Sequence, residues 1–330
     1  MAKAGCFNRS FMAVLFLTFS LCFVSTLAKL QQIDHPLNSD SLRILVVGDW
    51  GRLGHYNQTE VAFQMGRIAE EFDPAFIIST GDNFYENGLT GTDDPQFEES
   101  FSKIYTAKSL QKQWYTILGN HDYRGDVEAQ LSPILTNKDN RWFCMRSYIV
   151  NTEYAEIFFV DTTPFHDKYF THPGHDTYDW RGLVPNREEY LSNLLKDLDS
   201  GLKKSTATWK IVVGHHTVRS AGQHGDTKEL LKEFLSILKA DDVDLYINGH
   251  DHLVQHIRSL DSKLQYFTSG GGSKAWRGEY DLSKEGLKFY YDGQGFMTVK
   301  ITKTDADLIF YDVFGNVLYK WSVSKTHTAT

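Results

Sequence analysis

The chain contains very little cysteine: its 330 residues include three, and two of these, Cys6 and Cys22, fall within the first 28 residues. If that segment is removed, Cys144 stands alone and no internal disulfide can form. The fold must then be stabilised by its hydrophobic core, which a chain of this size can supply. Cys144 lies in the run RWFCMRSY, which is typical of a buried thiol in a strand; a disulfide to another chain is the alternative.

The chain also lacks a net positive charge, because 34 Lys and Arg residues face 42 Asp and Glu residues, for a formal net charge of -8. This acidic balance argues against nucleic acid as a partner. An anionic substrate would have to be attracted by a local positive charge.

Long apolar runs are absent after the first thirty residues. The one long run, Phe11 to Val24, follows Lys3 and Arg9 and precedes small residues that end at Ala28. This pattern is typical of a secretory signal peptide, and the run is short for a membrane span, although an uncleaved anchor is the alternative. We predict cleavage after Ala28, which removes two positive charges and no acids and takes the net charge from -8 to -10. The mature protein would be secreted or sent to a vacuole, and would have no membrane association.

No linker rich in proline, serine or glycine divides the chain. We therefore predict a signal peptide at 1–28, a polar lead-in at 29–42, and a single domain at 43–330. The sequon Asn57-Gln58-Thr59 predicts a glycan on Asn57, on an exposed turn.

Strand-like and helix-like segments alternate along most of the domain, which indicates an α/β fold. Two consecutive strand-like runs at 145–150 and 156–161 indicate a second sheet, and from Gln265 onward only strands are expected. We predict two sheets packed face to face between helices, a four-layer α-β-β-α sandwich. The expected helices lie at 60–72, 97–105, 127–137, 187–200 and 227–240.

Five apolar, strand-like runs end in a glycine that is followed at once by a metal-binding residue type. Glycine lets the backbone turn sharply where a strand stops, and open α/β sheets carry their sites at the carboxyl ends of strands. We therefore expect the five residues to meet at one sheet edge and to form a metal centre. They are Asp49 in ILVVGD, Asp82 in FIISTGD, Asn120 in YTILGN, His215 in KIVVGH and His250 in LYINGH.

Two further donors lie beside these runs, Tyr85 in GDNFYENG and His252 in NGHDH. Carboxylate, amide, phenol and imidazole groups together suit a pair of hard and borderline ions better than a zinc-thiolate site. The donor set therefore indicates two ions.

With these motifs the chain resembles the purple acid phosphatases of the calcineurin-like metallophosphoesterase superfamily, from about Arg43 to the C-terminus, with all five blocks in order. Because little sequence precedes the first motif, the resemblance is to the small, plant-like and tartrate-resistant type, without an extra N-terminal domain. The family implies an acid phosphatase, a phosphoric monoester hydrolase, with a dinuclear centre. Carried over to this chain, it assigns Asp49, Tyr85 and His252 to Fe(III), Asn120, His215 and His250 to a divalent ion (Zn, Mn or Fe), and Asp82 as the bridge.

The superfamily usually has a histidine two positions after the first aspartate, where this chain has Gly51. Tyr85 would replace that ligand. A phenolate is a hard, strongly donating anion that favours Fe(III), and charge transfer from it to iron would account for the family's colour.

The formal charges of such a centre leave room for an anion. Fe(III) and a divalent ion carry five positive charges, and Asp49, Asp82, a Tyr85 phenolate and one hydroxide carry four negative ones, so about one positive charge remains to attract a phosphate dianion. Because a trivalent ion acidifies its bound water strongly, the resemblance implies a metal-bound hydroxide nucleophile and activity at acid pH.

The family also assigns two histidines that touch the substrate or the leaving group, and His121 in GNHD and His224 in RSAGQHG match them. Asp122 is available to hold the His121 ring, and His216, beside a ligand, would support the site from behind. The long polar insert at 162–182 is expected as an exposed loop near the site that gates access.

The expected substrates are small phosphate monoesters, and we expect a monomer. A diesterase or pyrophosphatase on the same centre is an alternative, because loops set the substrate. The resemblance also allows a peroxidase-like side activity. A non-enzymatic metal-binding glycoprotein with the same fold is the alternative from another class.

Overall fold

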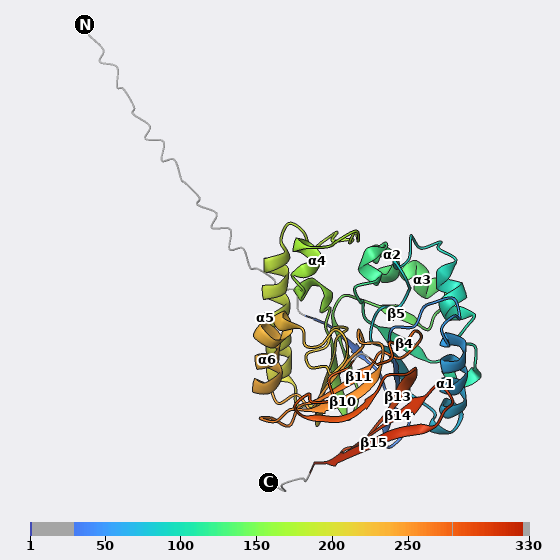
Figure 1. Ribbon diagram of the computed structural model, residues 1–330. Coiled ribbons are helices and arrows are strands. Elements are labelled where there is room, and N and C mark those ends of the chain that lie inside the picture. Colours follow the sequence, from blue (N-terminus) through green and yellow to red (C-terminus); the bar gives the residue numbers. More distant parts are fainter. Residues whose placement is uncertain (2–29, 279, 326–330) are drawn as a thin grey trace.

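We describe the protein from a computed structural model, which covers residue 1, residues 30–278 and residues 280–325 (Figure 1). The predicted signal peptide and its cleavage point lie outside the described residues. In the part of the chain that is described, we find no helix with the length and apolar character needed to cross a bilayer.

The strands form two sheets, each with both parallel and antiparallel pairs. The eight-stranded sheet has the order β1 (Gln31–Asp34), β6 (Tyr148–Asn151), β7 (Ala155–Phe159), β8 (Trp209–Val213), β9 (Leu245–Asn248), β11 (Gln265–Ser269), β10 (Val254–Arg258), β12 (Leu287–Tyr291). The seven-stranded sheet has the order β15 (Val317–Ser324), β14 (Asp305–Asp312), β13 (Gly295–Ile301), β2 (Leu42–Val47), β3 (Phe76–Ser79), β4 (Gln113–Thr116), β5 (Trp142–Cys144).

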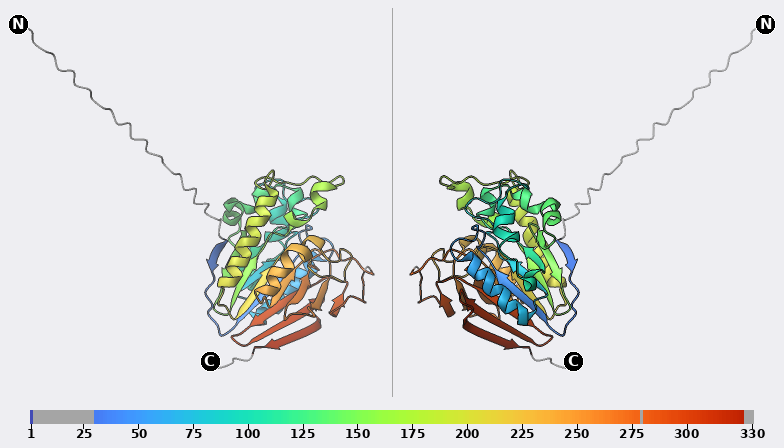
Figure 2. Two further views of the ribbon diagram at one scale, coloured as in Figure 1. Left: turned by 90° about the vertical axis from the view of Figure 1, so that its left-hand side faces the viewer. Right: turned by 90° about the vertical axis from the view of Figure 1, so that its right-hand side faces the viewer.

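Helices cover the outer faces of both sheets. The α-helices are α1 (Gln58–Phe72), α2 (Val127–Leu131), α3 (Pro133–Lys138), α4 (Lys168–Thr171), α5 (Arg187–Lys204) and α6 (Leu235–Ala240). Shorter π- or 3₁₀-helical turns are η1 (Glu98–Ser102), η2 (Lys108–Leu110), η3 (Asp122–Arg124), η4 (Thr163–Phe165) and η5 (Leu230–Phe234). Helices α5 and α6 lie on one side of the paired sheets and α1 on the other (Figures 1 and 2). The predicted four-layer α-β-β-α sandwich is therefore confirmed.

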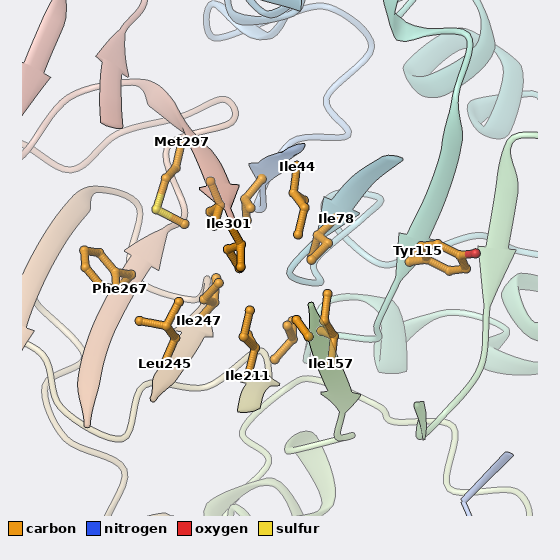
Figure 3. Close-up of a cluster of buried hydrophobic side chains, with 14 of the residues drawn as sticks. Ile44, Ile78, Tyr115, Ile157, Ile211, Leu245, Ile247, Phe267, Met297 and Ile301 are labelled. Atoms are coloured by element: carbon orange, nitrogen blue, oxygen red, sulfur yellow. The ribbon is translucent and has the colours of Figure 1, made fainter. Parts of the chain in front are cut away.

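Three apolar layers hold this sandwich together. Between the sheets, Ile44 and Ile78 from one sheet face Ile157 and Ile211 from the other (Figure 3). Along β2 the alternation is strict: Leu42, Ile44 and Val46 pack between the sheets, while Leu45 and Val47 pack under α1. Because both faces of these strands are buried, their sequences read as continuous apolar runs.

Several predicted segments differ in detail from the structure. The helix expected at 97–105 is a short π-helical turn, η1, and the one expected at 227–240 is divided into η5 and α6. The expected helix at 127–137 is divided into α2 and α3, because Ser132 is extended ahead of Pro133, which begins α3, and Ser132 caps it through its hydroxyl. The lead-in at 29–42 contains β1, which pairs in parallel with β6 at the edge of the larger sheet. Its few residues gave too short a pattern to indicate a strand.

Cys144 ends β5 and is buried, as predicted for a strand thiol. Burial raises the pKa of this thiol well above its usual range, which keeps it protonated and unreactive. A disulfide to another chain would require it to be exposed.

Candidate metal centre

All seven predicted ligands lie together at one end of the sandwich, but they do not come from one sheet edge. Asp49, Asp82 and Asn120 follow β2, β3 and β4 of the smaller sheet, whereas His215 and His250 follow β8 and β9 of the larger one. The expectation of a single edge was therefore wrong. The sheets are stacked so that carboxyl ends from both meet, and the centre lies across the gap between them.

Three of these residues have an unusual backbone conformation immediately after their glycines. The φ angles are 60° at Asp49, 51° at Asp82 and 70° at His250, in the left-handed region that residues with a side chain seldom adopt. Such a conformation costs about 1–3 kcal/mol and persists where the surrounding fold imposes it, often at functional sites. Here it turns each side chain from the strand direction into the shared site.

Tyr85 is the centre of one group of donors. Its hydroxyl oxygen lies 2.9 Å from Asp49 Oδ1, 2.9 Å from Asp82 Oδ2 and 3.0 Å from His252 Nε2. The carboxylates and His252 also have ligand atoms within 4.8 Å of one another, and all are buried. Two carboxylates, a phenol and an imidazole thus converge on one point.

A second group lies on the other side of Asp82. His215 Nε2 is 3.3 Å from Asn120 Oδ1, 3.3 Å from His250 Nδ1 and 3.4 Å from Asp82 Oδ1. The two oxygens of Asp82 therefore face different groups, Oδ2 toward Tyr85 and Oδ1 toward His215. This placement suits a carboxylate that bridges two ions.

The protonation of the site reflects its shortage of positive charge. Burial, together with the neighbouring carboxylate Asp82, raises the pKa of Asp49, and burial with both carboxylates raises the pKa of Tyr85. Although burial opposes it, the charge of Asp82 raises the pKa of His215 to about 9. Acidic oxygens that crowd together in a buried place fit a site that binds metal ions in place of protons.

Hydrogen bonds orient the imidazoles of the site. His252 donates from Nδ1 to the carbonyl of Lys274 at 2.8 Å, and His215 donates from Nδ1 to the carbonyl of Thr80 at 2.9 Å. In each ring the other nitrogen, Nε2, is left as a lone-pair donor that faces the site. Such outer hydrogen bonds fix the tautomer of metal-binding histidines.

His216 is close to the second group but is excluded from it by its own hydrogen bonds. Its Nδ1 lies 3.1 Å from Thr162 Oγ1 and its Nε2 lies 2.9 Å from the hydroxyl of Tyr169. Both ring nitrogens are thus engaged by protein. This agrees with the expectation that His216 supports the site from behind.

His121 faces the cavity in front of the metal-binding groups. Its Nδ1 donates to the carbonyl of Glu86 at 2.5 Å, which leaves Nε2 directed at the site, 4.0 Å from Asp82 Oδ2. The expectation that Asp122 holds this ring was wrong. The Asp122 carboxylate points inward and accepts from the backbone N–H groups of Asn83, Phe84 and Gly119, so it braces the loop that carries Asp82.

His224 lies on the opposite side of the same cavity. Its ring stacks on His250 with 4.1 Å between centroids, and Trp276 stacks on His252 at 4.0 Å. The backbone N–H of His224 donates to Asp251 at 2.9 Å, which fixes the loop that carries it. Burial lowers the pKa values of both cavity histidines, that of His224 to about 4.

The cavity itself has a volume of about 230 Å³ and is walled by the insert at 162–182. The start of the insert, Thr162 to Phe165, is buried, so the insert is a folded wall rather than a wholly exposed loop. Sequence reasoning assigned no role to several residues here. The only feature of the sequence that could have indicated them is their position, two to four residues from a motif or inside the insert. They are Arg52, Arg124, Lys168 and Trp276.

Close packing around the predicted ligands explains two of the glycines. A Cβ at Gly119 would lie 2.2 Å from Asp82 Oδ1, and one at Gly249 would lie 2.4 Å from Asp49 Oδ2. Neither carboxylate could keep its place beside a larger residue. The triplet Gly270 to Gly272 likewise lets the backbone run against Asp251 and Gly48.

Comparison with known proteins defines the class to which this fold and site belong. Residues 42–254 match the family model described as calcineurin-like phosphoesterase, and the chain belongs to that family. Purple acid phosphatase PPD1 from yellow lupin (Lupinus luteus) seeds has the same fold, with a TM-score of 0.64 at 17% identity over 88% of this chain and 55% of the lupin chain.

Within that class the chain is one of the purple acid phosphatases. It is 60% identical over 300 residues to purple acid phosphatase 4 of Arabidopsis thaliana, which covers 90% of this chain and 88% of the relative. It is also 29% identical over 304 residues to the human tartrate-resistant acid phosphatase type 5, covering 85% and 90% of the two chains. The predicted family is confirmed, and the chain is an acid phosphatase with a dinuclear metal centre.

Proposed function

We propose that the protein hydrolyses phosphate monoesters at acid pH on a centre that contains Fe(III) and one divalent ion, Zn, Mn or Fe. The observation that carries this proposal is the position of the Tyr85 hydroxyl, within 3.0 Å of two carboxylates and an imidazole. A phenolate beside two carboxylates is a hard, anionic donor set that suits a trivalent ion. The chemistry of the residues therefore fits the implied metals.

Each residue of the centre has a proposed role. Tyr85, Asp49 and His252 would hold the ferric ion, and Asn120, His215 and His250 would hold the divalent one. Asp82 would join them, since its two oxygens face different groups. When bound, the metal pair would supply an activated water, and its positive charge would stabilise the negative charge of the transferred phosphoryl group.

The residues in front of the centre would bind and orient the ester. His121 directs Nε2 into the cavity from one side and His224 presents its ring from the other, so both can donate N–H bonds to phosphate or leaving-group oxygens. Their pKa values are lowered in the buried site. A phosphate group bound between them would favour their protonated forms, which links proton supply to substrate binding.

Metal analysis and a visible spectrum of Tyr85→Phe test this function. We expect the variant to lose its colour and to retain less iron, because the phenolate oxygen is removed. Tyr154→Phe, on the turn between β6 and β7, is the matched control and should keep both. Unchanged colour and iron content in Tyr85→Phe would refute the phenolate assignment, and faster hydrolysis of diesters than of matched monoesters would favour the diesterase alternative.

The remaining proposals concern processing and organisation. We propose cleavage after Ala28, secretion with possible delivery to a vacuole, a catalytic domain at 43–330, a monomeric state and a glycan on Asn57. The exposure of Asn57, immediately ahead of α1, supports the last of these. N-terminal sequencing, size-exclusion chromatography and the mass change after glycosidase treatment of the secreted protein test them.

A further inference from the structure

Two cationic side chains line the cavity in front of the metal-binding groups. Arg124 follows the His121 motif on η3, and Lys168 begins α4 within the insert. Both line the same cavity as His121 and His224. The chain as a whole has a net charge of -8, so these two cations supply local positive charge where an anionic substrate would need it.

The two cations differ in what they bind within the protein. Arg124 is engaged, because it pairs with Asp176 at 2.9 Å and approaches His121 Nδ1 at 3.1 Å. Among the described residues, Lys168 has no carboxylate within 4.0 Å of its ammonium group. Glu229, an acid whose charge acts on Lys168, is occupied by His166 and by the backbone N–H of residue 167.

Lys168 is exposed, but helix α4 that carries it is fixed in place. The hydroxyl of Tyr169 lies 2.9 Å from His216 Nε2, which ties α4 to the end of β8 behind the metal centre. On the preceding residue, Asp167 pairs with Arg187 of α5 at 2.7 Å. The Lys168 ammonium extends over the Tyr169 ring, 5.2 Å from its centroid, and faces the cavity.

From this geometry we propose that Lys168 forms a second anion subsite, which binds a phosphate group of the substrate other than the one that is transferred. This inference rests on the proposed function, because the first phosphate must lie at the metal centre between His121 and His224. The favoured substrates would then be esters with two phosphate groups, such as bisphosphorylated sugars. The unpaired ammonium would supply the charge that recognises the second group.

The test compares a hexose monophosphate with the matching hexose bisphosphate, using the purified, metal-loaded enzyme. In Lys168→Gln we expect the kcat/KM ratio of bisphosphate to monophosphate to fall about fivefold, the size of effect typical of one partly exposed charge pair. Lys168→Arg should restore most of the ratio, because it restores the charge. Added salt should reduce the wild-type preference, since exposed charges are screened.

Lys320→Gln is the matched control, because it removes the same charge from β15, at the edge of the seven-stranded sheet. We expect it to leave the ratio unchanged. If Lys168→Gln lowers kcat/KM equally on both substrates, Lys168 acts at the transferred phosphate. If it lowers kcat/KM on neither substrate, Lys168 binds no phosphate. Either result overturns the subsite. If the wild-type protein hydrolyses neither ester, the proposed function has failed instead.

Discussion

The guanidinium of Arg52 lies over the ring of Tyr85, with 3.6 Å between Arg52 Cζ and the ring centroid. Arg52 is almost completely buried and forms an ion pair with Glu86, the residue that follows Tyr85. A buried cation on the face of an aromatic ring withdraws electron density from it and stabilises an anionic form of that ring. Arg52 is therefore placed to modify the proposed iron ligand without touching the metal.

This contact predicts a change of colour. Removing the positive charge in Arg52→Gln should make the phenolate a stronger donor, so the charge-transfer band should move to longer wavelength. A visible spectrum of the iron-loaded protein measures the shift, and Arg67→Gln, on the exposed face of α1, is the control. An Arg52→Gln band at the wild-type wavelength would show that the stacked charge has no electronic effect.

His224 can be tested by removal. We expect His224→Ala to lower kcat by about 100-fold or more, the usual contribution of a side chain that assists proton transfer. Both metals should remain, because His224 only stacks on the proposed ligand His250. Metal content and steady-state kinetics should be measured together, with the exposed His55→Ala for comparison. Wild-type kcat in His224→Ala would remove this residue from the mechanism.

The close approach of Gly119 to Asp82 predicts that a larger residue at position 119 disturbs the proposed bridging carboxylate. In Gly119→Ala the new methyl group would lie 2.2 Å from Asp82 Oδ1 and 2.4 Å from Asp82 N, so the carboxylate must move. We expect both metals to be depleted, as in Asp82→Asn, which removes the charge of the proposed bridge directly. Gly91→Ala is the control, because a Cβ there meets nothing within 4 Å. Retention of two metals per chain in Gly119→Ala would contradict this prediction.

The raised pKa of the buried Asp161 carboxyl predicts that the stability of the fold depends on pH. Burial raises the pKa of this carboxyl to about 6, although Arg146 and the hydroxyl of Tyr123 oppose the effect. Because the folded pKa is above the unfolded value, the folded state holds the proton more tightly and loses stability as pH rises from about 4 to about 6. The loss is at most about 3 kcal/mol.

Asp161→Asn should remove this contribution. Urea unfolding across that pH range should therefore give a free energy of unfolding that falls less steeply with pH in the variant. Asp199→Asn, at a partly exposed position of α5 where the carboxylate pairs with Lys203, controls for the loss of one carboxylate. Parallel pH profiles for wild type and Asp161→Asn would exclude a raised pKa.

Much of the fold and the family could be predicted from local sequence. The strands of the core have continuous apolar runs because both of their faces are buried, and α1 and α5 have clear helical periodicity. Short or edge elements were harder, because four residues of β1 or five of β12 carry too little pattern. The division of one predicted helix at Pro133 was visible in the sequence and was missed.

The sequence by itself determined which donors this protein offers and in what order, because strand, glycine and ligand are neighbours along the chain. Only the tertiary structure decided how they combine. Stacking of the two sheets put Asp82 and His215, which follow strands of different sheets, within 3.4 Å of each other. Tertiary contacts engaged both ring nitrogens of His216 with Thr162 and Tyr169, away from the metal-binding groups. They also turned Asp122 from its neighbour His121 toward the loop that carries Asp82. Lys168 likewise reached the cavity through the packing of the insert. Local patterns fix backbone shape, whereas the direction and partners of a side chain depend on segments that are distant in sequence.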